Sequence, residues 1–256
     1  MPTGLILAIT FLTRLPMPKV VNFEPADMRK SVVWFPVAGV VVGCFVALAW
    51  WLGGLVHPAL AGLFGVLMWV WITGALHLDG LSDLTDALGA SHRQPERFFS
   101  VLSDPHVGSF GVVALVIQLL SKFVLLSLAA EYHMSLLLIV LVPAWARLGA
   151  AWWSLSLPTL KSGLAQTFAW QGKASQLWLS VSALLVVSLW QPVILCAILP
   201  IALWRIWLKQ RLGGQTGDAL GAGIELVESG ALLLLVVLLA VLSDNAATEW
   251  LGKFAL

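Results

Sequence analysis

Long apolar segments separated by shorter polar ones dominate the chain from residue 32 onward. A helix that crosses a bilayer needs about 20 predominantly apolar residues, with roughly 17–25 tolerated. The pattern predicts about seven transmembrane helices, at residues 32–56, 58–77, 108–130, 134–156, 176–190, 192–208 and 227–243. The segments at 176–190 and 192–208 are short and are also compatible with one broken hairpin. Residues 4–15 are too short to span and are predicted to form an interfacial or re-entrant piece.

Composition supports an integral membrane protein. Of the 256 residues 60% are hydrophobic and 11% are charged, whereas about a quarter of the residues in a soluble domain are charged. The 14 tryptophans fit the aromatic belts of membrane proteins, and a net charge of +1 argues against a nucleic-acid partner. We therefore expect an all-α, polytopic helical bundle in contact with membrane lipid, formed as a single domain over residues 1–256.

Basic residues are distributed unevenly between the predicted loops. The short connections carry no Lys or Arg, whereas the segments on the other side carry most of them, at 1–31, 78–107, 157–175 and 209–226. An excess of Lys and Arg marks the cytoplasmic side of a membrane protein. The sequence thus predicts a multi-pass protein of the cytoplasmic (inner) membrane, with its N-terminus inside and its acidic motifs facing the cytoplasm.

Three aspartates fall in the run His77-Leu78-Asp79-Gly80-Leu81-Ser82-Asp83-Leu84-Thr85-Asp86. Asp79, Asp83 and Asp86 share one face of a helix, because residues three and four apart are neighbours there. Mg²⁺ binds one or two carboxylates and completes its shell with water and substrate phosphates. We predict a Mg²⁺–diphosphate site with these aspartates as metal ligands and catalytic groups, and with His77 as a candidate base. The alternative is a solvated helix start, where acids are favoured.

A second motif is Gly213-Gly214-Gln215-Thr216-Gly217-Asp218, which precedes a predicted helix. Glycines let backbone amides approach an anion, and a helix start offers its positive end. We predict that the substrate phosphates bind to Gly213, Gly214, Thr216 and Gly217. Asp218, as a catalytic group, and Glu225 lie seven residues apart on one helical face and are predicted metal ligands. The alternative is a loop followed by a helix whose small residues permit close packing.

Two charges lie inside predicted spans, where they are costly and indicate function by default. Arg147 would bind a phosphate oxygen or pair with one of the acids. Lys122, together with Gln118 and Ser121, would line a polar stripe between helices.

Two residues outside the spans are further candidates for phosphate binding. Arg14 either reaches the phosphates or anchors the chain at the membrane interface. Asp104 is either a further ligand or the N-cap of the following helix, with Pro105 at its first position.

Two acidic motifs, a glycine-rich loop and basic side chains fit transfer chemistry on a diphosphate. The pattern leaves two such reactions open. One is attack at phosphorus, as in an alcohol-phosphotransferase, and the other is attack at an allylic carbon, as in membrane prenyltransferases of lipid synthesis. An ion-coupled transporter is a third class, although the acids cluster at the membrane edge, which counts against it.

The same motifs resemble those of the cobalamin synthase family, the adenosylcobinamide-GDP ribazoletransferases. Residues 77–83 are similar to its H-L-D-G-L-A-D motif, and residues 213–226 are similar to its G-G-x-T-G-D…G-A…E-L motif. The segment 11–18 and Trp34-Phe35-Pro36 with Gly39 match its N-terminal pattern, so the resemblance covers about residues 10–230.

The resemblance implies that the 3′-hydroxyl of α-ribazole, or of α-ribazole 5′-phosphate, attacks the cobinamide-side phosphorus of adenosylcobinamide-GDP. GMP would leave and adenosylcobalamin or its 5′-phosphate would form, the last step of cobalamin assembly. Mg²⁺ is the implied cofactor, a homodimer is compatible with the helices, and late corrinoid-pathway enzymes are candidate partners. In the third family motif a basic residue precedes the aspartate and Ser-Arg follows it, whereas this chain has Ser103-Asp104-Pro105-His106.

Overall fold

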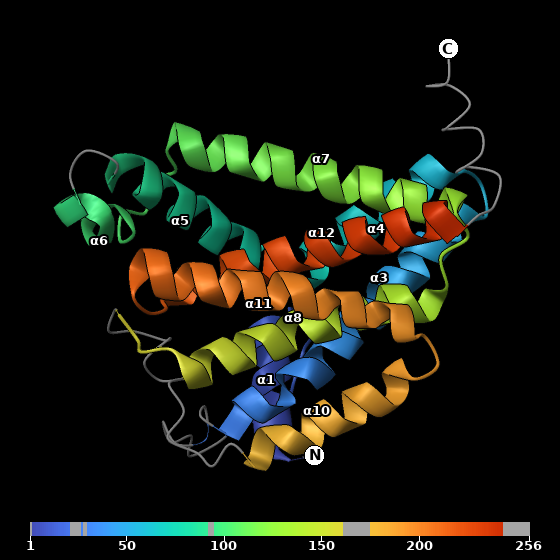
Figure 1. The fold of residues 1–256 in the computed structure, drawn as a ribbon, viewed down its shortest axis with the longest axis horizontal. Helices are drawn as coiled ribbons and strands as arrows, with labels where there is room; N and C mark the ends of the chain where they lie inside the picture. Colours follow the sequence, from blue (N-terminus) through green and yellow to red (C-terminus); the bar gives the residue numbers. More distant parts are fainter. Residues whose placement is uncertain (1, 21–26, 28–29, 92–94, 161–174, 243–256) are drawn as a thin grey trace.

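The computed structural model describes residues 2–20, 27, 30–91, 95–160 and 175–242, and the regular elements in these ranges are helical apart from one isolated bridge. Figure 1 shows long helices running side by side in a bundle, which confirms the all-α prediction. The elements are α1 (Thr3–Leu12), η1 (Val32–Trp34), α3 (Phe35–Gly54), α4 (Pro58–Thr73), α5 (Leu76–Ser91), η2 (Pro95–Arg97), α6 (Phe98–Val101), α7 (Ser109–Glu131), α8 (Leu136–Ser156), α10 (Ser175–Ser188), η3 (Pro192–Ala197), α11 (Ile198–Trp207), η4 (Leu208–Leu212) and α12 (Gly217–Leu242).

The protein is a polytopic membrane bundle, and the described residues contain five or six candidate spans where the sequence pattern predicts about seven. Among the described residues five helices are long and apolar enough to cross a membrane, namely Val32–Gly54, Ser109–Glu131, Leu136–Ser156, Pro192–Leu212 and Gly217–Leu242. The pair α4 and α5 would add a sixth as one broken span. Helix α10 has 14 residues and falls short of a span. Helix α12 starts before the predicted residue 227, because Glu225 and Glu228 are buried inside it.

The predicted helix at residues 58–77 breaks at Gly74 and Ala75. Both residues have left-handed backbones, with φ of 63° and 61°, and α5 leaves α4 at an angle of 87°. The break ends α4 with hydrogen bonds from Gly74 N to Trp71 O and from Ala75 N to Val70 O, at 3.2 and 3.1 Å. A left-handed alanine backbone costs about 1–2 kcal/mol, so the packing around this bend must offset that cost.

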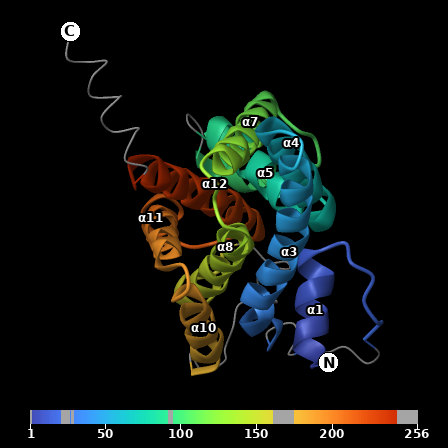
Figure 2. The same cartoon turned by 90° about the vertical axis from the view of Figure 1, so that its right-hand side faces the viewer.

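Helix α8 lies at the centre of the bundle, between α3 on one side and α11 on the other (Figure 2). Glycines on α3 allow the backbones of α3 and α8 to approach closely. A Cβ atom on Gly39 would lie 2.5 Å from the Cα atom of Ala144, and one on Gly43 would collide with the backbone of Val140. Small residues serve the same purpose in other membrane bundles, where close packing drives helix association.

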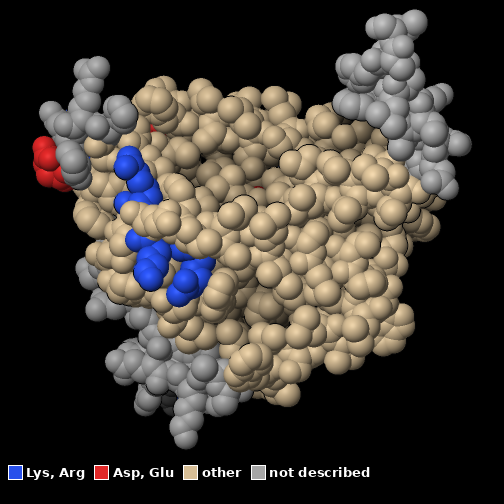
Figure 3. Space-filling model, viewed as in Figure 1, with Lys and Arg blue, Asp and Glu red and all other residues tan. Residues whose placement is uncertain are grey.

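Charged side chains gather at one end of the molecule. In the view of Figure 3, Lys and Arg lie over the end at which α6 is found and α11 finishes, where η4 carries Lys209 and Arg211. The long helices instead expose large apolar side chains, such as Leu67, Ile117 and Leu233, as lipid-facing surfaces do. The basic residues 29, 93, 161 and 173 of the predicted cytoplasmic side lie outside the described residues.

Candidate active site at the start of helices α5 and α12

The two acidic motifs meet where α5 packs against the start of α12 (Figure 1). A Cβ atom on Gly80 would lie 2.8 Å from the backbone oxygen of Asp218 and 3.1 Å from its Cα atom. A Cβ atom on Gly221, one turn further along α12, would lie 3.4 Å from the Cα atom of His77. The motifs therefore touch through their backbones, and a side chain at position 80 would separate them.

The carboxylates at this junction differ in their exposure to the surroundings. Asp79 is exposed, and Asp83 and Asp218 are half-buried, whereas the residues between the two α5 acids are buried. The predicted common face of Asp79 and Asp83 is thus the accessible edge of α5. We call Asp79, Asp83 and Asp218 together the site edge.

The five predicted metal ligands do not converge on one point. Within the described ranges no group of three or more His, Cys, Asp or Glu side chains lies close enough to hold a metal ion. Mg²⁺ typically takes one or two protein carboxylates and fills its shell with substrate phosphates and water. The oxygen donors of the site edge fit such a shared ion, and the contacts of Asp86 and Glu225 give those two acids other partners.

Asp86 holds the first turn of α7. Its two carboxylate oxygens accept hydrogen bonds from the backbone N–H groups of Gly108 and Gly111, at 2.7 and 2.9 Å. Gly108 is the N-cap residue of α7, and a negative charge near a helix N-terminus is stabilising. The alternative interpretation of the sequence has the aspartates stabilise the start of their own helix. Asp86 instead caps α7, a helix that begins later in the chain.

The glycine-rich loop turns the chain between η4 and α12. Gly213 adopts φ of 79°, a conformation that favours glycine. Gly214 faces the backbone oxygen of Pro158, where a Cβ atom would collide. The neighbouring Gln215 donates to Pro158 O at 2.8 Å and accepts from Leu160 N at 2.9 Å, forming the isolated bridge.

Thr216 and Gly217 begin α12. The Thr216 hydroxyl accepts a hydrogen bond from the backbone N–H of Ala219 at 3.1 Å and so caps the helix, and this threonine is buried. Gly213 and Gly217 are exposed. Of the four predicted phosphate-binding residues, Gly217 presents accessible backbone at the positive end of α12. The N–H of Gly213 donates to Leu208 O at 3.0 Å at the end of η4, and Gly214 and Thr216 hold the loop in shape.

Arg14 lies at the bend that leads into the first motif. Its backbone N–H donates to Ile72 O at 2.8 Å, and its side chain crosses Gly74, where a Cβ atom would lie 3.0 Å from the Cγ and Cδ atoms of Arg14. The residue is exposed. The bend therefore places the positively charged side chain of Arg14 near the end of α5 at which Asp79 lies.

Asp104 lies in the exposed loop between α6 and α7. Its carboxylate accepts from the backbone N–H of His106 at 3.0 Å and contacts the His106 ring nitrogen Nδ1 at 2.7 Å. These hydrogen bonds hold the pKa of Asp104 below its ordinary value. The alternative that Asp104 caps α7 is wrong, because the cap is Gly108.

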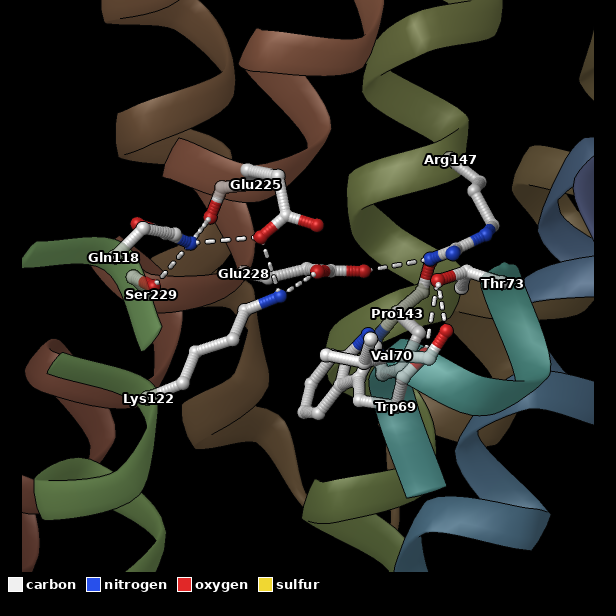
Figure 4. A network of polar contacts seen from close by, with 10 residues as sticks. All are labelled: Trp69, Val70, Thr73, Gln118, Lys122, Pro143, Arg147, Glu225, Glu228 and Ser229. Carbon is white, nitrogen blue, oxygen red and sulfur yellow. Dashed lines mark hydrogen bonds and ion pairs between the residues drawn. The ribbon is translucent and has the colours of Figure 1, made fainter. Parts of the chain in front are cut away.

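A second group of charges is buried where α7, α8 and α12 meet (Figure 4). Arg147 lies 2.7 Å from Glu228, and Lys122 lies 2.6 Å from Glu228 and 2.7 Å from Glu225. Arg147 and Glu228 are fully buried. We call these four residues the buried network. Its two cations and two anions sum to zero, and the expected pairing of Arg147 with an acid is confirmed.

Polar and aromatic neighbours complete the buried network. Gln118 donates to the backbone oxygen and the Oε2 atom of Glu225 and to the Ser229 hydroxyl, each at 2.9 Å. The Lys122 ammonium lies 4.4 Å from the centroid of the Trp69 ring, within cation–π distance. Gln118 and Lys122 thus form part of the predicted polar stripe. Glu228 had no predicted role, although its position three residues after Glu225 in an apolar run was a usable signal.

His77 lies behind the site edge rather than on it. The side chain is buried, and neither ring nitrogen has a hydrogen-bond partner among the described residues. A residue enclosed in this way does not reach a substrate proton at the edge, so the structure offers no direct support for His77 as a base.

Comparisons with known proteins agree with this arrangement. A family model described as Cobalamin-5-phosphate synthase matches residues 4–237. The adenosylcobinamide-GDP ribazoletransferase of Thiobacillus denitrificans is 55% identical over 93% of this chain and 96% of its own length. Those of Laribacter hongkongensis and Novosphingobium aromaticivorans are 52% and 45% identical, each over 91% of this chain and 96% of its own length.

No solved structure matches the chain, so the family assignment rests on sequence. The family match spans both acidic motifs and the helices that bring them together. The chain belongs to the cobalamin-5-phosphate synthase family, together with the adenosylcobinamide-GDP ribazoletransferases named above.

Proposed function

We propose that the chain is a single-domain membrane transferase that carries out the final step of cobalamin assembly, joining adenosylcobinamide-GDP to α-ribazole or its 5′-phosphate. The observation that carries this proposal is the backbone contact between Gly80 and Asp218, which unites the two motifs at one edge. The activity named for the relatives needs such a site, because a diphosphate must be held while its phosphorus is attacked.

The reaction breaks a phosphoanhydride bond and forms a phosphodiester. The 3′-oxygen of the nucleoside forms a bond to the cobinamide-side phosphorus, and the bond from that phosphorus to the bridging oxygen of the diphosphate breaks. GMP takes the bridging oxygen and its electron pair, and the hydroxyl proton is released. Charge accumulates on the phosphoryl oxygens in the transition state, so catalysis depends on positioning and on electrostatic stabilisation.

The site edge supplies the carboxylates for a metal ion. Asp79, Asp83 and Asp218 would hold Mg²⁺, which neutralises diphosphate charge when it is bound. The exposed backbone of Gly217, at the positive end of α12, would bind a phosphate oxygen. Arg14 would add a positive charge at the bend. The basic residues at one end of the molecule support a cytoplasmic location for this edge.

Turnover by the purified protein in detergent tests the proposal. We expect GMP and the complete corrinoid to form together from adenosylcobinamide-GDP and α-ribazole with Mg²⁺, and EDTA to stop both. A folded preparation that yields neither product under these conditions would refute the transferase proposal. Activity that persists after EDTA treatment and metal removal would refute the metal role alone.

Position 80 tests the structural basis. Gly80→Ala places a methyl group against the Asp218 backbone and is expected to lower turnover strongly. Gly54→Ala is the matched control, because a Cβ atom there meets only the Ala61 Cβ, at an ordinary 3.7 Å. Equal activity of the two variants would show that the close contact of the motifs is not required.

A further inference from the structure

A pocket of about 310 Å³ opens beside the C-terminal half of α5. Its apolar lining comes from Leu88, Phe98, Phe99, Leu160 and Leu212. This volume is in the range of small-molecule sites, which are mostly apolar with a few placed polar groups. Among the described residues of the lining, the polar groups are Ser91 on α5 and Arg211 on η4.

The pocket adjoins the glycine-rich loop of the second acidic motif. Leu212 directly precedes this loop. Leu160, which also lines the pocket, lies against Gly214, where a Cβ atom would lie 2.7 Å from the Leu160 side chain. On α5, Leu88 lies about 12 Å along the helix from Gly80, at a rise of 1.5 Å per residue, and faces away from Asp79 and Asp83. A molecule seated here lies beside the loop that leads to Asp218.

The lining suits a planar apolar ring with a negative charge nearby. Phe98 and Phe99 pack edge to face, with centroids 5.2 Å apart and planes at 88°. Phe98 is buried, whereas Phe99 keeps 44% of its surface exposed, so aromatic surface remains for a ligand. Arg211 is exposed and offers the planar donor fork that binds phosphate.

We propose that this pocket binds the benzimidazole ring of the nucleoside substrate, with Arg211 contacting the 5′-phosphate when it is present. The proposal rests on the proposed function and extends it by giving the accepting nucleoside its own subsite. A benzimidazole ring bonded to ribose through one nitrogen has no hydrogen-bond donor and only one acceptor nitrogen. Guanine presents several donors and acceptors, which would be left unsatisfied against the apolar lining. The corrin is much larger than the pocket.

Substitution of the two exposed lining residues tests the subsite. Stacking on an aromatic side chain is worth about 1–3 kcal/mol per base, so Phe99→Ala should raise the KM for α-ribazole about tenfold. The KM for adenosylcobinamide-GDP and kcat should not change. Arg211→Gln should raise the KM for α-ribazole 5′-phosphate more than that for α-ribazole. Phe64→Ala and Lys209→Gln, exposed residues outside the pocket lining, are the matched controls.

Equilibrium binding separates the failure of this inference from the failure of the function. α-Ribazole and α-ribazole 5′-phosphate are used as probes with the purified protein in the absence of the second substrate, and GMP is used in parallel. If the wild type turns over but Phe99→Ala binds α-ribazole normally and Arg211→Gln binds α-ribazole 5′-phosphate normally, the subsite is wrong and the function stands. If these variants lose affinity for GMP instead, the pocket holds guanosine and the proposal is overturned. If the wild type gives no turnover, the proposed function fails first.

Discussion

Helix α12 carries acids of two kinds, and their surroundings differ completely. Asp218 begins the helix, half-buried, against Gly80 of α5. Glu228 lies three turns further on, fully buried and bound to both Arg147 and Lys122. A carboxylate in an apolar interior stays charged only when cations and hydrogen bonds replace water. On α12 the carboxylate of Glu228 therefore maintains the fold, whereas the carboxylate of Asp218 is a candidate for chemistry.

Helix α5 repeats the contrast. Asp79 is exposed at the site edge, whereas Asp86, two turns away, has both oxygens engaged by the first turn of α7. Spacing alone places these aspartates on one face and suggests one shared role. The burial of each carboxylate, rather than its position in the motif, separates the structural acids from the candidate catalytic ones.

Removal of a structural acid should have the largest effect on stability. Glu228→Gln leaves Arg147 and Lys122 with one acid between them. Loss of one partner of a buried ion pair costs about 3–5 kcal/mol, so the unfolding midpoint in detergent should fall sharply. Glu131→Gln, an exposed acid at the end of α7, is the control and should leave the midpoint unchanged.

Replacement of both partners sharpens this test. Arg147→Met combined with Glu228→Gln should destabilise the protein less than the sum of the two single substitutions, because their energies are coupled. Additive losses would show that the contact contributes no pairing energy.

Removal of an acid from the site edge should act on catalysis instead. Asp218→Asn is expected to lower kcat by about 10²–10³, the usual cost of losing one electrostatic stabiliser of a transition state. The unfolding midpoint should stay within experimental error. A variant that keeps near-normal turnover would remove Asp218 from the catalytic group.

The cap of α7 should show an intermediate effect on stability. Asp86→Ala removes the acceptor for two backbone N–H groups, and loss of a helix cap costs about 0.5–2 kcal/mol. Protein that remains folded should still turn over, as measured by GMP release per folded molecule. If turnover disappears while the unfolding midpoint holds, Asp86 belongs with the site edge after all.

Asp104 should show the smallest effect. Its side chain is exposed, and its carboxylate contacts the backbone N–H and the ring of His106. A lowered pKa stabilises the folded state above the ordinary pKa of the carboxyl, and this contribution is lost only in acid. Asp104→Asn should therefore lower the unfolding midpoint slightly at neutral pH, by an amount that disappears in acid, and should leave the KM for adenosylcobinamide-GDP unchanged. A raised KM would instead support the phosphate role expected from the sequence.

Much of the architecture was predictable because it depends on local composition. Apolar runs locate most of the membrane helices, and the i, i+4 spacing correctly places Asp79 and Asp83 on the accessible face of one helix. The break at Gly74 and Ala75 was missed because the apolar pattern continues through it. The predicted start of α12, at residue 227, was too late. The buried acids of this helix interrupt its apolar pattern, and the sequence does not show the cations that pair with them.

Pairings between distant residues could not be predicted in the same way. Arg147 and Glu228 are 81 residues apart, and Lys122 and Glu228 are 106 apart. The sequence marks each of them as costly inside a membrane, but only the packing of α8 and α7 against α12 selects the partner. The contact of Gly80 with Asp218 is likewise a property of tertiary packing.

The buried network also constrains how the chain is made. Synthesis proceeds from the N-terminus, so the helices that carry Lys122 and Arg147 leave the ribosome well before Glu225 and Glu228 exist. Until α12 is made, Lys122 and Arg147 lie in the membrane or at the insertion machinery without Glu225 and Glu228 as counter-ions. A chain that stops before α12 would retain two uncompensated charges, which offers quality-control proteases a chemical mark of incomplete synthesis.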